Sequence, residues 1–459
     1  MGERVIVIGG TAAGLSAASK AKRVRPDLDI EVYERTGYIS YGACGLPYFV
    51  GGMIDDPDEL VSLFPHEMSN KRGIPTFTHH EVTAIDRAAK TVSVTDLDTG
   101  RQFQRPYDKL VIATGAAPVR PGIPGTELDG VYYLRTVEDG IRLKGALAAR
   151  RRIAILGGGF IGLEMAEELT QAGAEVTVFE QLPRLLPFLD ESFSQAAAQT
   201  LERHGVRLFT GTALAAIHGA DGRVTAVETS DGQRVEVDGV LISIGVRPAT
   251  ALARACGLEL GLKDGIVVDE HQRTSDPAIW ACGDCVQMRH LLTGQPVYVP
   301  LGTTANKQGR VAADHLCGRA SRYPGAQGSS VIKVCDLTVA STGLNEKSAR
   351  EAGLEQARAA GYDAAASLIR KRDCASYYPG GSDMHICLVV DRASGRLLGA
   401  QAVGGPTVAG RVDVFATAIT AGMTVAQINE LDLVYAPPVA PVYDPILIAA
   451  SQAMKLVNP

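Results

Sequence analysis

Apolar and polar residues follow one pattern twice along the chain. In the first copy an apolar run at residues 4–9 precedes small residues, a helical stretch and a second strand over residues 30–34. In the second copy the two strands fall at residues 152–157 and 175–180, with a glycine turn and a helical stretch between them. Short apolar runs separated by such a turn and helix are typical of strand–helix–strand units in a parallel sheet. The pattern therefore predicts two such units.

Both predicted turns carry glycines at fixed spacing. The second turn holds a full G-x-G-x-x-G from Gly157 to Gly162, whereas the first has Thr11 at the middle position. Each second strand ends on an acid, Glu34 or Glu180. Small residues let backbone N–H groups approach a pyrophosphate at a helix N-terminus, and the acid accepts hydrogen bonds from ribose hydroxyls. Two copies in register favour dinucleotide binding over tight packing without a ligand.

The rest of the chain completes the predicted domains. Two β-rich stretches, at residues 76–96 and 206–244, each lead into an apolar strand and a glycine turn. A short strand near Ile279 runs into Cys282-Gly283-Asp284, and a loop rich in Gly, Ser and Pro follows at 318–328. Beyond this loop, from Val331 onward, we expect strands and helices to alternate without a further glycine-rich nucleotide-binding turn. This order predicts an α/β protein with two Rossmann-like domains, β-rich insertions and a C-terminal α+β domain that serves an interface.

Composition narrows the class of protein. The chain has 459 residues with 46% hydrophobic content, which indicates two or three domains. A net charge of −6 argues against a nucleic-acid partner, since no excess of Lys and Arg is present to neutralise phosphates. We expect no membrane span, because no apolar run is long enough, and no signal peptide, because the first strand begins by Val5. Eight scattered cysteines indicate a reducing, cytoplasmic location.

Cys44 is the strongest candidate for redox chemistry. It follows the first dinucleotide unit in the run SYGACGLPY, and Phe49 stands five positions further on, where a redox pair would place a second thiol. An oxidised Cys44 would therefore be a sulfenic acid or a mixed disulfide with a small thiol. Cys282 and Cys285 have redox-motif spacing but no second ligand pair, so we predict no metal site there.

These motifs together resemble a known superfamily. The two dinucleotide units, Ala113-Thr114-Gly115, Gly245-Val246-Arg247-Pro248 and Ala281-Cys282-Gly283-Asp284 are similar in kind and order to the FAD-dependent pyridine nucleotide-disulfide oxidoreductases. The SYGACGLPY segment around Cys44 resembles the active-site segment of the single-cysteine branch of this superfamily. That branch contains coenzyme A disulfide reductase, NADH oxidase and NADH peroxidase. The resemblance implies a homodimer, with residues 1–118 and 246–325 binding FAD, 119–245 binding NAD(P)H and 326–459 forming the dimerisation domain.

The resemblance also implies which residues contact the cofactors. The FAD side would comprise Gly9, Gly10, Ala13, Gly14, Glu34, Arg35, Thr114, Gly115, Gly283, Asp284 and Ala305. The NAD(P)H side would comprise Gly157, Gly159, Phe160, Ile161, Gly162, Glu180 and Gly245. A carboxylate at Glu180 favours NADH, because it repels the 2′-phosphate of NADPH. Arg184 is close enough in sequence to soften that repulsion, so NADPH use stays open.

Three features resemble coenzyme A disulfide reductases in particular. The oxidases and peroxidases place a histidine in the first glycine turn, where this chain has Ala12. The segment beginning Tyr435-Ala436-Pro437-Pro438 and the element Tyr377-Tyr378-Pro379-Gly380 resemble the reductases' two tyrosine elements, whose tyrosines reach the partner's cysteine and protonate a leaving thiolate. Basic and polar residues would hold a substrate derived from coenzyme A: Ser16, Lys20, Arg23, Ser40, Lys71 and Asn306.

The predicted function is thus NAD(P)H-dependent reduction of a small disulfide, most simply coenzyme A disulfide, with Cys44, Tyr377 and Tyr435 as catalytic residues. Ala43 departs from the reductases, which often carry asparagine before the cysteine, and this leaves the disulfide open. Alternatives are an NADH oxidase or peroxidase, a coenzyme A persulfide or polysulfide reductase, and a flavin-bound redox sensor.

Overall fold

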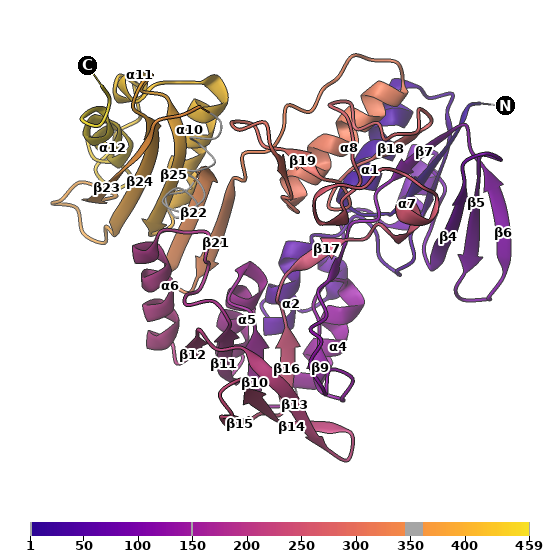
Figure 1. The fold of residues 1–459 in the computed structure, drawn as a ribbon, viewed down its shortest axis with the longest axis horizontal. Coiled ribbons are helices and arrows are strands. Elements are labelled where there is room, and N and C mark those ends of the chain that lie inside the picture. The colour runs from indigo at the N-terminus through magenta and orange to yellow at the C-terminus, as the bar shows by residue number, and fades with distance from the viewer. Residues whose placement is uncertain (1, 148–149, 345–360, 459) are drawn as a thin grey trace.

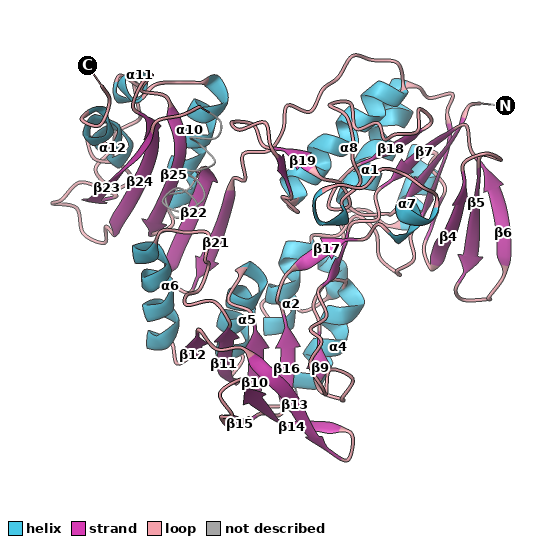
Figure 2. Ribbon diagram, in the orientation of Figure 1, coloured by secondary structure: helices cyan, strands magenta, loops and turns pink. Residues whose placement is uncertain are grey.

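A computed structural model of the chain describes residues 2–147, 150–344 and 361–458. Figure 1 shows three domains, with the first parallel sheet on the right, the second below, and a C-terminal antiparallel sheet on the left. Figure 2 shows helices lying against each of these sheets. Within the described ranges, no helix is both long and apolar enough to cross a membrane.

The first sheet is parallel, with strand order β18-β7-β1-β2-β3. Its strands are β1 (Arg4–Ile8), β2 (Asp29–Tyr33), β3 (Thr76–Phe77), β7 (Lys109–Ile112) and β18 (Ile279–Ala281). Strand β18 arrives from far along the chain and completes the sheet beside β7. Around the sheet lie α1 (Ala12–Val24), α3 (Pro65–Arg72), α7 (Ala251–Ala255) and α8 (Gly302–Leu316), while α2 (Leu46–Gly51) packs against helices of the second domain. An antiparallel insertion comprises β4 (His80–Asp86), β5 (Thr91–Asp96) and β6 (Gln102–Pro106).

The second sheet repeats this arrangement, with order β12-β11-β10-β16-β9. Its strands are β9 (Val131–Tyr132), β10 (Arg152–Leu156), β11 (Glu175–Glu180), β12 (Arg207–Thr210) and β16 (Gly239–Ile242). The helices are α4 (Val137–Leu147), α5 (Phe160–Gln171) and α6 (Glu191–Arg203), and the insertion is β13 (Leu214–Ala220), β14 (Arg223–Thr229) and β15 (Arg234–Glu236). The chain crosses between the domains at β8 (Ala116–Pro118) and β17 (Val246–Pro248), which pair antiparallel. These crossings lie beside the boundaries that we propose at 118/119 and 245/246.

The C-terminal sheet is antiparallel, with order β21-β22-β25-β24-β23. Its strands are β21 (Ser330–Val334), β22 (Leu337–Gly343), β23 (Ala364–Arg372), β24 (Asp383–Asp391) and β25 (Leu397–Gly404), followed by α10 (Val408–Ala421), α11 (Val425–Asn429) and α12 (Pro445–Met454). In the described part of this domain the strands come first and the helices after them. Residues 345–360, between β22 and β23, lie outside the described residues, so the expected alternation stays a prediction. Short elements elsewhere are β19 (Met288–Arg289), β20 (Pro296–Val297) and three 3₁₀ turns at Ala43–Gly45, Pro57–Leu60 and Leu262–Asp264.

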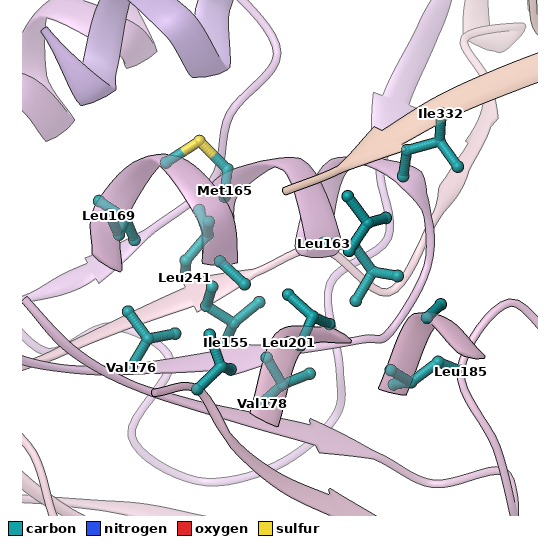
Figure 3. Packing of buried hydrophobic residues seen from close by; sticks show 14 of the residues in the cluster. Ile155, Leu163, Met165, Leu169, Val176, Val178, Leu185, Leu201, Leu241 and Ile332 are labelled. Atoms are coloured by element: carbon teal, nitrogen blue, oxygen red, sulfur yellow. The ribbon is translucent and has the colours of Figure 1, made fainter. Parts of the chain in front are cut away.

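One apolar core joins the second domain to its neighbours. Figure 3 shows α5 lying over the second sheet, with Leu163 near Ile332 of β21 and with Met165 pointing away from the sheet. The same cluster includes Leu46 and Phe49 of α2, both almost fully buried. Burying apolar side chains stabilises a fold by roughly 25 cal/mol per Å² removed from water. Because this core is shared, α5 fixes the position of α2 and of the segment just before it.

Candidate functional site

The first glycine turn is held by close packing and by a buried carboxylate. A Cβ atom at Gly14 would lie 1.9 Å from the carbonyl oxygen of Gly9, so α1 can start this near β1 only with glycine there. The Glu34 carboxylate accepts a hydrogen bond from Gly10 N–H at 2.7 Å and another from Thr36 N–H at 2.9 Å. Glu34 is buried yet retains lone pairs for further donors such as ribose hydroxyls.

The second turn reproduces these contacts. A Cβ at Gly162 would lie 2.0 Å from the carbonyl oxygen of Gly157. Glu180 accepts from Gly158 N–H at 2.7 Å and from Leu182 N–H at 2.8 Å. Two segments about 150 residues apart thus build the same strand, turn, helix and acid.

The second turn also leaves room for a ligand. A Cβ at Gly159 would meet no heavy atom within 4 Å, and the same holds at Gly245. This open space lies at the start of α5, next to Phe160 and Ile161, where backbone N–H groups are available to an anion. The residues present therefore fit a pyrophosphate.

The predicted flavin residues beyond the first turn lie on neighbouring elements. Gly283 N–H donates to Gln308 on α8 at 2.8 Å, and a Cβ at Gly283 would crowd Ala13 at 2.8 Å. Asp284 forms an ion pair with Arg135 at 2.8 Å. The loop after β18 is thus tied to α1, to α8 and to the segment that enters the second domain.

Thr114 and Gly115, also predicted for the flavin side, follow β7. The Thr114 hydroxyl donates to the carbonyl of Ala249 at 2.6 Å, which links the end of β7 to the returning chain. Ala305 is buried on α8, while Arg35 directly follows Glu34.

Cys44 lies in the 3₁₀ turn Ala43–Gly45, immediately before α2. Its side chain is exposed, whereas the other seven cysteines, all within the described residues, are buried or half-buried. Ser40 N–H donates to the carbonyl of Gly10 at 3.0 Å, which fixes this segment against the first glycine turn. Phe49 is buried, so the position where a partner thiol would stand is part of the core.

The charges around Cys44 work against a thiolate. Partial desolvation and the carboxylate of Glu164 raise the pKa of the Cys44 thiol, while Arg135 opposes them. Burial, together with Glu167 and Glu168 on the same helix, raises the pKa of Glu164 itself to about 7. In these surroundings the Cys44 thiol is a weaker acid than a free cysteine.

The residues predicted to hold the substrate divide into two groups. Ser16 on α1 and Asn306 on α8 lie together, with the Ser16 hydroxyl 2.7 Å from the Asn306 amide oxygen. Lys20 instead pairs with Asp314 at 3.3 Å, and Lys71 pairs with Glu67 at 2.7 Å. Arg23 donates to the carbonyl of Ser19 at 3.2 Å. The basic side chains thus have partners in the protein that an anion would need to replace.

The two predicted tyrosines meet on the C-terminal domain. The Tyr377 and Tyr435 hydroxyls lie 3.3 Å apart, and both side chains are exposed. The hydrogen bond to Tyr435 raises the pKa of Tyr377. Tyr377 is therefore the tyrosine of the 377–378 pair that contacts the second element, and it stays protonated at neutral pH.

Comparison with known proteins identifies the family. Residues 3–309 match the pyridine nucleotide-disulphide oxidoreductase family, and residues 329–444 match the dimerisation domain of the same family.

This chain belongs to the pyridine nucleotide-disulphide oxidoreductase family.

Several members of the family are similar over nearly their whole length. The chain is 36% identical over 458 residues to an NADH oxidase of Methanocaldococcus jannaschii, covering 99% of both chains. It is 35% identical to an NAD(P)H coenzyme A polysulfide/persulfide reductase of Pyrococcus horikoshii, covering 98% of both. The crystal structure of reduced Bacillus anthracis CoADR-RHD superimposes with a TM-score of 0.95 at 34% identity, covering 99% of this chain and 81% of that one.

Membership in this family confirms the predicted class of enzyme. The protein is an FAD-dependent NAD(P)H oxidoreductase of the flavoprotein disulfide reductase type, and its fold is the predicted α/β arrangement. The match to a dimerisation domain supports a homodimer.

Sequence reasoning missed two charged residues of this oxidoreductase. Arg135 lies in the segment before α4, outside any fingerprint, and Glu164 looks like an ordinary helix residue two positions after Gly162. Their influence on Cys44 arises only because α2 packs between α4 and α5. Arg184, predicted to soften charge near Glu180, instead pairs with Glu191 at 3.7 Å.

Proposed function

We propose that this oxidoreductase reduces coenzyme A disulfide with Cys44 as its single redox-active cysteine. The observation that carries the proposal is the contrast between exposed Cys44 and buried Phe49, which leaves no second thiol for an internal disulfide. The partner sulfur of oxidised Cys44 must then come from a small thiol. The described residues include no cluster suited to a metal ion.

The glycine turns would hold the two cofactors. FAD would lie along Gly9, Gly14, Glu34, Thr114, Gly115 and Asp284, and NAD(P)H along Gly157, Gly159, Gly162, Glu180 and Gly245. The open space at Gly159 and the buried carboxylates support this assignment. When bound, FAD would pass two electrons from NAD(P)H to sulfur.

Cys44 would act first as a nucleophile. Its thiolate attacks one sulfur of the disulfide, so that the S–S bond breaks, a Cys44–coenzyme A mixed disulfide forms and one coenzyme A thiolate leaves. A tyrosine hydroxyl gives that thiolate a proton. Two electrons then break the mixed disulfide, which releases the second coenzyme A and restores the Cys44 thiolate. One NAD(P)H and one further proton thus yield two thiols.

Tyr377 and Tyr435 of one subunit would serve the Cys44 of the other. Both are exposed on the domain that matches the dimerisation family, and their hydroxyls lie 3.3 Å apart, where either could donate a proton to a sulfur brought close to the pair. Across the dimer they would approach the leaving sulfur from outside the cofactor domains.

The residues Ser16, Lys20, Arg23, Ser40, Lys71 and Asn306 would contact coenzyme A. Ser16 and Asn306 present a joined polar pair between α1 and α8. The adenosine 3′-phosphate would compete with Asp314 for Lys20 and with Glu67 for Lys71.

NADH would be the preferred reductant. Glu180 is fixed by two backbone N–H groups, and its negative charge opposes a 2′-phosphate. The pairing of Arg184 with Glu191 supports the same preference, because it holds that cation away from Glu180. The protein would act in the cytoplasm, since eight cysteines without framework spacing suit a reducing compartment.

A persulfide of coenzyme A is the second candidate substrate. It is favoured by the 35% identity to a reductase whose name includes that activity. Attack by Cys44 on the outer sulfur would break the S–S bond, release coenzyme A thiolate to the same tyrosines and leave a persulfide on Cys44, which the two electrons from NAD(P)H would reduce to sulfide and the Cys44 thiolate. An oxidase role is disfavoured by Ala12, which places a methyl group at the start of α1 where the oxidases have a histidine.

Turnover of the FAD-loaded protein with a single electron acceptor at a time tests these choices. NADH oxidation is followed with coenzyme A disulfide, coenzyme A persulfide or dioxygen as the only acceptor. Two thiols released per NADH with the disulfide support the proposal. Turnover confined to the persulfide moves the assignment to the second candidate, and turnover confined to dioxygen overturns both.

A further inference from the structure

Arg411 lies buried between the two segments that carry the paired tyrosines. It projects from α10, and its Nε and Nη2 donate to the Asp444 carboxylate at 2.8–3.1 Å. Nη2 also donates to the carbonyl of Asp373 at 2.9 Å. Asp373 begins the 373–382 loop, which holds Tyr377, and Asp444 ends the 434–444 segment, which holds Tyr435. One guanidinium therefore joins both segments.

Asp373 is itself held in place by further hydrogen bonds. Its carboxylate accepts from Ser382 N–H at 2.8 Å and from the Thr407 hydroxyl at 3.1 Å. Its own N–H donates to the carbonyl of Ser382 at 3.0 Å. The 373–382 loop is thus pinned at its base, beside Arg411.

The Asp444 end is also fixed. Asp444 is the N-cap of α12 and accepts from Ile446 N–H at 2.9 Å. Between the two ends, Ala375 N–H donates to the carbonyl of Pro437 at 3.1 Å, so the loop and the segment run side by side toward the tyrosines.

Apolar packing does little to hold the 434–444 segment in one protomer. Val434, Val439, Val442 and Tyr443 are each more than half exposed, with Val434 at 86%. The 434–444 segment is therefore held against the 373–382 loop mainly by polar contacts, which involve Arg411, Ala375 and Tyr377. Of these, only Arg411 provides a buried, charge-assisted contact.

We infer that Arg411 is a positioning residue, which sets Tyr377 and Tyr435 in register so that they can protonate the leaving coenzyme A thiolate. The inference rests on the proposed role of these tyrosines. Lysine cannot replace arginine here, because one ammonium does not reproduce the planar fork that reaches both Asp444 and the Asp373 carbonyl.

The test compares Arg411→Lys with wild type in the FAD-loaded dimer. We expect kcat for coenzyme A disulfide to fall by about tenfold or more, while NADH-driven reduction of ferricyanide, which needs neither tyrosine, stays within about twofold. Asp444→Asn keeps the helix cap but removes the charge, and should act in the same direction. Arg370→Lys, at an exposed ion pair on β23, is the matched control and should change neither rate.

A double-mutant cycle separates positioning from general damage. In the Tyr377→Phe/Tyr435→Phe background, Arg411→Lys should change kcat by no more than about twofold, because the tyrosines through which it acts are gone. An equal further loss in that background would overturn the inference, as would a parallel loss of ferricyanide reduction. If the tyrosine variants slow disulfide reduction and Arg411→Lys does not, only this inference fails. If the tyrosine variants themselves have no effect, the proposed tyrosine role fails with it.

Discussion

The hydroxyl of Tyr377 lies 3.3 Å from that of Tyr435, although 58 residues separate them in the chain. Both side chains are exposed in one protomer, at 74% and 49% of their surface. The hydrogen bond to Tyr435 raises the pKa of Tyr377 above the ordinary value for a tyrosine. Such a pair on a dimerisation domain is suited to donate a proton to a sulfur held by the other subunit.

Mixed dimers test whether the tyrosines act across the interface. One subunit carries Cys44→Ser, and the other carries Tyr377→Phe/Tyr435→Phe. If the tyrosines serve the partner's Cys44, the mixed dimer has one complete site and should recover about half of wild-type disulfide reduction, whereas both parent homodimers stay low. Tagged subunits allow purification of the mixed species, and activity no higher than that of the parents would rule out the cross-subunit arrangement.

Charges near Cys44 should set how readily its thiol reacts. Glu164 raises the pKa of Cys44 and Arg135 lowers it, so Glu164→Gln should lower that pKa and Arg135→Gln should raise it. We expect alkylation by iodoacetamide at neutral pH to be about threefold faster in the first variant and slower in the second. The rate is followed against pH by peptide mass spectrometry. Identical profiles would show that desolvation alone controls the thiol.

The dinucleotide units could be predicted nearly to the residue, because their constraints are local. Gly14 and Gly162 must be glycine for contacts within their own turns, and Glu34 and Glu180 bond to neighbouring turn residues. The roles of Glu164 and Arg411 could not be found this way. Each depends on which segment packs beside it, α2 in one case and the 434–444 segment in the other, and no local pattern encodes that choice.

Glu164 should also make stability depend on pH. Its pKa is about 7 in the fold against 4.5 ordinarily, so the folded state binds more protons between these values. The free energy of unfolding therefore falls as pH rises through this window. Glu164→Gln should remove that loss and be more stable than wild type by about 2 kcal/mol at pH 8, with little difference near pH 4.5.

Urea unfolding of the FAD-loaded protein at several pH values measures this effect. Glu175→Gln, at an exposed position on β11 of the same domain, is the control and should follow wild type. A variant that gains stability equally at all pH values would mean that Glu164 does not titrate in this range.

Glu180 should determine the choice of reductant. The double variant Glu180→Ser/Gln181→Arg removes the carboxylate and supplies a cation for the 2′-phosphate. We expect it to raise the ratio of kcat/KM for NADPH over that for NADH by about tenfold or more. Gln181→Arg alone should shift the ratio less, because the carboxylate remains. Steady-state kinetics with both nucleotides decide the matter, and an unchanged ratio in the double variant would locate specificity elsewhere.

In the proposed mechanism Cys44 forms a mixed disulfide with the substrate. The FAD-loaded protein is prepared under anaerobic conditions with a free Cys44 thiol and oxidised flavin, so that no electrons remain to break the adduct, and is treated with one equivalent of coenzyme A disulfide per site. We predict one released coenzyme A per site and one coenzyme A adduct, located by peptide mass spectrometry on Cys44 and absent from Cys44→Ser. An adduct on another cysteine, an internal disulfide, or no adduct until oxygen is admitted would contradict the account.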